Sequence, residues 1–252
     1  MSAISPQLTN APIVEAIVDI ECDMPPKFDL VALEGAARDA YGDKYPVVQT
    51  QFVEQHQIEQ RPDGAATHTL KRGIQALQFR QDDSKQLIQV RSQGYSFNRL
   101  APYSTLDDYL GEIERTWRLF VGLAAPVQVR AVRLRYINRL ALPLKEGKLE
   151  TADYLKVSPQ LPDESNLTFV GFLNQHSAVE TGTGNQANIV LAAQPPENEM
   201  LPVIFDIGVN HLENGEVENW PWILENILSL RSLKNRIFEN TLTKPCLNLF
   251  RQ

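Results

Sequence analysis

Apolar and polar residues alternate along several stretches of the chain, and this alternation is typical of half-buried β-strands. It is clearest at residues 13–21 and 127–142, where nearly every second residue is apolar. Turn-forming residues separate the shorter alternating stretches from one another. We predict these further strands at residues 47–60, 74–80, 86–98, 167–180, 188–193 and 202–213.

A helical period replaces the alternation in two long segments. At residues 105–120 the apolar residues are spaced by four, three, four and three positions, which predicts an amphipathic helix with Ser104 or Thr105 as its N-cap. Pro221, a favoured first helical residue, opens a second predicted helix at residues 221–240. A shorter helix is predicted at residues 30–41, and a weaker one at 151–157.

The order of these elements predicts an α+β protein built from two related halves, residues 1–125 and 126–252. Each half reads strand, helix, three strands, long helix. The strings Phe-Val-Glu-Gln-His ending at His56 and Phe-Leu-Asn-Gln-His ending at His176 occupy the same place in each half. We expect one continuous antiparallel sheet with both long helices packed on one face, in a saddle-like layout analogous to that of TATA-binding protein.

Composition narrows the functional class. The chain has 43% hydrophobic and 22% charged residues, as globular proteins do, and its net charge of −7 weakens any attraction to nucleic acid. Its apolar runs are too short to cross a bilayer, and the N-terminus lacks the pattern of a signal peptide, so we expect a cytoplasmic protein. Cys22 and Cys246 predict neither a disulfide framework nor a thiolate metal site.

Three arginines share one face of the predicted strand at residues 127–142. Arg133, Arg135 and Arg139 alternate with apolar residues, so their side chains point away from the apolar face. Planar, multidentate guanidinium groups on an open sheet face could hold a phosphate, a carboxylate or a nucleic-acid backbone. We therefore take these arginines as candidate ligand-binding residues.

The acidic residues of the first strand offer a structural alternative. Glu15, Asp19 and Glu21 share the polar face of residues 13–21. If this strand pairs antiparallel with residues 127–142, acids face arginines, and such cross-strand pairs contribute about 0.2–1 kcal/mol each. The arginine row is thus either a binding face or an internal charge seam, and the sequence leaves both open.

His56 and His176 form a second candidate, because a symmetry-related histidine pair could bind a ligand or transfer a proton near neutral pH. The alternative is that both histidines are structural or surface residues without a functional role. The chain has four histidines and none of the spacings HxxxH, HxH or HExxH, so we expect no metal site and no cofactor. No GxSxG motif is present either, and we predict no catalytic residue.

Residues 181–185, Thr-Gly-Thr-Gly-Asn, have the glycines of a phosphate loop but no following Lys-Ser/Thr, and they join two predicted strands. We predict a hairpin turn there.

Four segments carry a resemblance that spans nearly the whole chain. They are Asn-Ala-Pro-Ile-Val-Glu-Ala at 10–16, Ala-Pro-Tyr at 101–103, Arg-Tyr-Ile-Asn-Arg at 135–139, and Leu-Lys-Asn at 233–235 followed by Phe238 and Thr241. In these segments the chain resembles a sporadically distributed family of uncharacterised bacterial and archaeal proteins. The resemblance implies no catalytic residues. It points to an accessory protein of patchily inherited gene sets, in a defence or toxin–antitoxin setting, and to a protein partner.

The leading hypothesis is a non-catalytic binding protein that engages a protein partner or a small anionic ligand at the arginine face or between the halves. One alternative is an enzyme, such as an anion-processing hydrolase with a site between the halves. Another is nucleic-acid binding by a saddle-like sheet, which the acidic net charge disfavours. The oligomeric state is left open.

Overall fold

One nine-stranded antiparallel sheet organises the molecule. The computed structural model describes residues 8, 10–60, 66–144, 150–157 and 171–251, and for residues 54–60 and 66–72 it describes the backbone only. The strand order is β2-β3-β4-β5-β1-β6-β9-β8-β7, which confirms the α+β class and the continuous antiparallel sheet. The strands are β1 (Ile13–Asp23), β2 (Val47–Gln60), β3 (Ala66–Arg80), β4 (Gln86–Arg91), β5 (Gly94–Leu100), β6 (Gln128–Pro143), β7 (Leu173–Val179), β8 (Gln186–Ala193) and β9 (Met200–His211).

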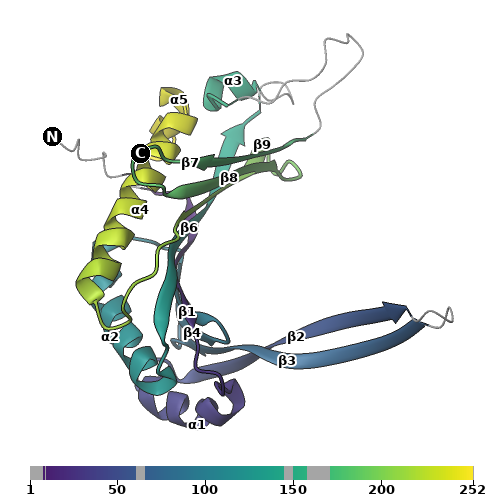
Figure 1. Ribbon diagram of the computed structural model, residues 1–252. Coiled ribbons are helices and arrows are strands. Elements are labelled where there is room, and N and C mark those ends of the chain that lie inside the picture. Colours follow the sequence, from purple (N-terminus) through teal and green to yellow (C-terminus); the bar gives the residue numbers. More distant parts are fainter. Residues whose placement is uncertain (1–7, 9, 61–65, 145–149, 158–170, 252) are drawn as a thin grey trace.

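The sheet curves into an arc, and α1, α2 and α4 lie along its outer, convex side (Figure 1). The opposite, concave side, which we call the inner face, is open between the β2–β3 and β7–β8 ends of the sheet. The helices are α1 (Leu30–Tyr41), α2 (Asp107–Ala124), α3 (Thr151–Tyr154), α4 (Trp220–Thr241) and α5 (Lys244–Asn248).

The core lies between the sheet and these helices, and β6 shows how its sequence sorts the two faces. Leu134 and Leu140 are fully buried, as are Phe120 of α2 and Ile227 of α4. The arginines between the buried residues of β6 are partly exposed or exposed. The period-two pattern of β6 therefore separates a buried helix-facing side from an open inner side, as predicted.

The single strand predicted at residues 86–98 is wrong, because a turn divides it into β4 and β5. Gly94 follows this turn with φ of +139°, and a Cβ atom there would lie 2.1 Å from the carbonyl oxygen of Ile20. Only glycine allows both the backbone conformation and this close approach of β5 to β1. Four strands therefore follow α1, whereas three follow β6.

Two local expectations about the helices also differ from the structure. The predicted N-cap of α2 at Ser104 or Thr105 is wrong, since Leu106 takes that position without a side-chain cap. The short helix α5 was not predicted; Thr243 caps it by accepting a hydrogen bond from the Cys246 amide at 3.3 Å. Over the described ranges, no helix combines the length and the apolar character needed to span a membrane.

Candidate functional site

Polar residues lie side by side across the inner face, in a line perpendicular to the strands. The register of the sheet places one such residue on each of eight neighbouring strands, from β2 to β8. Registered partners in antiparallel strands share a face, so all eight belong to the inner side. We call this line the polar row; its members in strand order are Gln49, Gln78, Gln89, Ser96, Asp19, Arg133, Asn210 and Gln186.

Side-chain amides connect the row on the side of the first half. The Nε2 atom of Gln78 lies 3.3 Å from Oε1 of Gln89, whose own amide donates to Oδ1 of Asn98 at 3.2 Å. Asn98 in turn donates to the carboxylate of Glu15 at 2.7 Å. Three strands are thus linked to β1 by a chain of hydrogen bonds that ends on a charge, an arrangement in which each bond polarises the next.

The charge seam between β1 and β6, one of the two alternatives that the sequence left open, forms at only one of the three arginines. β1 and β6 pair antiparallel, and Asp19 is registered opposite Arg133. However, Arg133 lies 2.5 Å from the carboxylate of Glu21, while Asp19 accepts from Arg91 of β4 at 2.6 Å. Burial of Asp19 outweighs the attraction of Arg91 and raises the pKa of its carboxyl group above the ordinary value.

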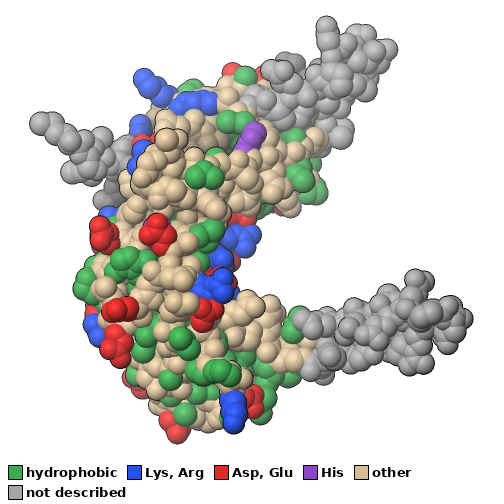
Figure 2. Space-filling view, viewed as in Figure 1, with side chains coloured by type: hydrophobic (Ala, Val, Ile, Leu, Met, Phe, Trp, Pro, Cys, Tyr) green, Lys and Arg blue, Asp and Glu red, His purple; other side chains and the backbone are tan. Residues whose placement is uncertain are grey.

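The other two candidate arginines also hold carboxylates, from residues that the sequence analysis did not single out. Arg135 binds Asp206 of β9 through two nitrogens, with Nη2 2.6 Å and Nε 3.0 Å from the carboxylate oxygens. Arg139 lies 2.7 Å from Glu197, in the segment before β9. Basic and acidic side chains accordingly lie together on the inner wall (Figure 2). The sequence contained a sign of Asp206, because in the predicted strand at residues 202–213 it alternates with apolar residues and so points to the polar side.

The two candidate histidines lie at opposite edges of the sheet. His56 belongs to β2 and His176 to β7, and seven strands separate these edges in the strand order. His176 is exposed, and the side chain of His56 lies outside the described residues. The sheet therefore does not pair the two residues as neighbours. Within the described part of the chain, no three His, Cys, Asp or Glu side chains are grouped as metal ligands would be.

The hairpin turn predicted at residues 181–185 is confirmed. It connects β7 and β8, and the backbone amide of Glu180 donates to the carbonyl of Asn185 at 2.7 Å.

A second polar cluster lies on the helix side of the sheet, around Tyr136 of β6. The hydroxyls of Tyr103 and Tyr136 are 3.0 Å apart, and Nζ of Lys234, from α4, lies 4.1 Å from the centre of the Tyr136 ring. We call these three residues the Tyr–Lys cluster. Burial raises the pKa of both tyrosines, and burial together with nearby Arg231 lowers the pKa of Lys234 to about 8.

The four segments behind the family resemblance meet around this cluster. The amide of Ala101 donates to the carbonyl of Val14 at 3.0 Å, and the amide of Arg139 donates to that of Pro12 at 2.8 Å. Tyr103, Tyr136 and Lys234 supply the side-chain contacts between the remaining segments. The sequence motifs did not predict that these segments meet, because the local pattern of a strand or helix does not show which distant segment that element contacts.

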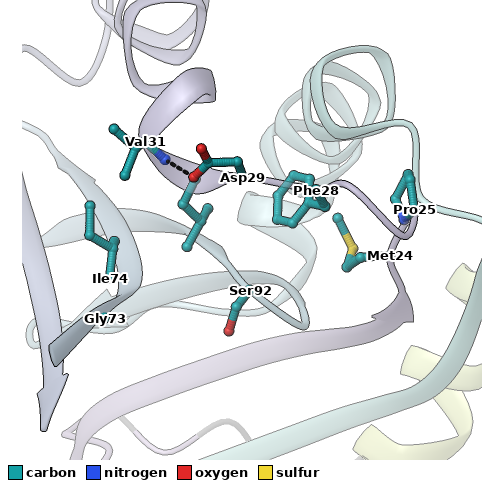
Figure 3. Close-up of a pocket in the computed structure, with 9 residues that line it drawn as sticks. Met24, Pro25, Phe28, Asp29, Val31, Gly73, Ile74 and Ser92 are labelled. Atoms are coloured by element: carbon teal, nitrogen blue, oxygen red, sulfur yellow. Dashed lines mark hydrogen bonds between the residues drawn. The ribbon is translucent and has the colours of Figure 1, made fainter. Parts of the chain in front are cut away.

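A pocket of about 460 Å³ lies beside the start of α1 (Figure 3). Its polar side chains are Asp29 and Ser92. Asp29 is the N-cap of α1, and its carboxylate already accepts a hydrogen bond from the backbone amide of Val31 at 2.9 Å. The pocket therefore offers little chemistry to a ligand. Its lining consists of Met24, Pro25, Phe28, Asp29, Leu30, Val31, Gly73, Ile74 and Ser92.

Comparison with models of protein families finds no match to this chain, and a search of curated proteins finds none either.

Proposed function

We propose that the chain is a non-catalytic binding protein whose inner face holds a protein partner. The observation that carries this proposal is the polar row, which extends over eight strands without an apolar member. Non-obligate protein interfaces are no more apolar than the rest of a protein surface, and they carry about ten direct hydrogen bonds. A curved wall of amides and paired charges fits such an interface.

The pairing of charges favours a protein over a polyanion. Each of the arginines Arg91, Arg133, Arg135 and Arg139 lies against its own carboxylate. A phosphate backbone gains affinity from basic groups whose counterions it releases, and here it would meet as many acids as bases. A protein surface can instead accept the remaining guanidinium N–H groups and donate to the carboxylates at the same time.

We also infer that the two halves, residues 1–125 and 126–252, arose by duplication and that both long helices pack on one face. The strand order supports this, because β1 and β6 lie together at the centre and each half extends outward to its own edge hairpin. The position of α2 and α4 on the convex side in Figure 1 supports the packing. The additional strand of the first half is then an insertion or a division of one ancestral strand.

Membership of the sporadic bacterial and archaeal family, with a role as a cytoplasmic accessory protein in a defence or toxin–antitoxin setting, belongs to the same proposal. The meeting of the four resembling segments around Tyr136 supports it, since segments far apart in sequence form one structural unit.

The test replaces Arg133, Arg135 and Arg139 together by Gln and measures affinity for a partner identified by capture from the native host. We expect at least a tenfold loss, because several charge-assisted hydrogen bonds disappear at once. A control is the Arg38→Gln, Arg118→Gln variant, which removes two surface charges. These two arginines also hold carboxylates, on the exposed surfaces of α1 and α2, and the control should bind normally.

A second variant guards against misfolding of the triple variant. Asn210 lies in the polar row, and the structure shows no side-chain hydrogen bond for it among the described residues, so Asn210→Trp obstructs the face without breaking an ion pair. The proposal fails if folded Asn210→Trp and folded triple variant both bind the partner as the wild type does. A complex whose affinity falls steeply with salt would point to nucleic acid instead.

A further inference from the structure

The helix side of the sheet carries an ammonium group without a carboxylate. Among the residues that the structure describes, Nζ of Lys234 contacts the face of the Tyr136 ring and forms no ion pair with an acid. An aromatic face attracts a cation but satisfies none of its three N–H donors. The ammonium group therefore still has hydrogen bonds to donate.

The tyrosine pair next to it has the same surplus. Two hydroxyls that hydrogen-bond to each other use one of their two protons. The structure shows no further acceptor for Tyr103 or Tyr136 within its described residues, so one phenolic proton remains available. Either hydroxyl can be the donor of the shared bond. If Tyr103 donates, the free proton is on Tyr136, which is only 2% exposed, and an unused donor there is costly.

The charges near the cluster balance in number, but no acid among the described residues is in direct contact with the ammonium group. Arg231 acts electrostatically on Tyr103, Tyr136 and Lys234, and it is itself neutralised by Asp107 of α2, with Nη1 2.7 Å from the carboxylate. Glu239 is the acid that favours the charged form of Lys234, and it acts without a direct ion pair. Among the described residues, the ammonium group consequently has no carboxylate in direct contact.

From these observations we infer that the Tyr–Lys cluster binds a small oxyanion, the carboxylate or phosphate group of a ligand. Such a group accepts hydrogen bonds from both the phenolic hydroxyl and the ammonium group, and it places a negative charge in direct contact with the ammonium group. Because Lys234 lies over the ring that carries the Tyr136 hydroxyl, both donors are within reach of one small anion. Lys234 and Tyr103 are partly exposed, so the anion can enter from solvent.

This site lies on the opposite side of the sheet from the inner face and does not depend on the proposed protein partner. It is also distinct from a purely structural clamp. A clamp would need only the contact of Lys234 with the aromatic ring, whereas an anion site needs the hydroxyls as well.

The experiment is an NMR titration of the full chain labelled at lysine Cε, with sodium phosphate in one arm and sodium acetate in the other, at constant ionic strength. We expect a saturable shift of the Lys234 signal and a rise of its pKa from about 8 as the anion binds. The exposed Lys27 provides the control signal in the same spectrum. The arm that saturates at the lower concentration identifies the preferred anion.

The Tyr103→Phe, Tyr136→Phe variant keeps both rings and therefore the contact with Lys234, but it removes the hydroxyls. We expect roughly tenfold weaker anion binding. If this variant does not fold, Tyr103→Phe alone tests the same point at the more exposed ring. The inference is overturned if neither anion shifts Lys234 more than Lys27 at tens of millimolar, or if the folded Phe variant binds as tightly as the wild type.

Discussion

The two sides of the sheet differ in how they accommodate positive charge. On the inner face each candidate arginine lies against a carboxylate, and Arg135 does so through two nitrogens although its side chain is 54% exposed. On the helix side Lys234 is partly buried and lies against an aromatic ring. Paired charges on an open face remain available for hydrogen bonding without attracting ions. A partly buried charge with no carboxylate in contact attracts an ion of opposite sign.

The sharpest test of this comparison uses two adjacent residues of β6. Leu134 is fully buried on the helix side, so Leu134→Ala should lower the free energy of unfolding by about 3 kcal/mol. Arg135→Ala should cost about 1 kcal/mol or less, because a half-exposed ion pair contributes little. Urea unfolding of both variants measures the difference. Equal costs would mean that the inner face is buried in solution.

The next effect concerns the pH dependence of stability. The pKa of Lys234 is lowered from 10.5 to about 8, so between these values the unfolded chain holds a proton that the folded chain has lost. Stability then rises with pH in this window, and we expect the wild type to gain on the order of 1–2 kcal/mol relative to Lys234→Met between pH 7.5 and pH 10.

Urea unfolding of both proteins at the two pH values measures this gain. Cys22 and Cys246 act in the opposite sense, because burial raises the pKa of each thiol to about 12, but they are common to both proteins and cancel in the difference. A constant difference between the two proteins across this range would contradict the sheltered position of Lys234.

The smallest expected effect on stability comes from a substitution that breaks an ion pair on the inner face. Asp206→Asn leaves Arg135 without its carboxylate, while Glu34→Gln removes the partner of Arg38 on α1 and changes the net charge equally. Both should change stability by less than about 1 kcal/mol. We expect Asp206→Asn to elute from immobilised heparin at higher salt than Glu34→Gln, since the freed Arg135 has other guanidinium groups nearby. Identical elution would show that the inner face does not concentrate charge.

The sequence predicted those parts of the fold that depend on local pattern. Alternation at β1 and β6 gave both strands and assigned each arginine to the correct side. It failed between β4 and β5, where the buried apolar residues change from even positions (Ile88, Val90) to odd positions (Tyr95, Phe97). The break in the alternation was present in the sequence, and residues 92–93 form the turn that produces it.

The candidate site was predictable in the same partial way. The arginines were found from parity along one strand, whereas Asp206 and Glu197 became their partners only through the pairing of β6 with β9. The Tyr–Lys cluster joins three segments that no local pattern connects. The sequence shows that Tyr103, Tyr136 and Lys234 carry hydrogen-bond donors. Only the folded structure shows that these donors lack acceptors among the described residues.

The polar row also sets a scale for what the inner face can hold. Neighbouring strands lie about 4.8 Å apart, so the seven intervals of the row measure about 34 Å. Because the sheet is curved, that length runs along an arc, and a straight α-helix lying across the arc would have fewer than about 22 residues. The number of strands thus sets the length of the inner face. The additional strand of the first half lengthens this face by one strand spacing, about 4.8 Å.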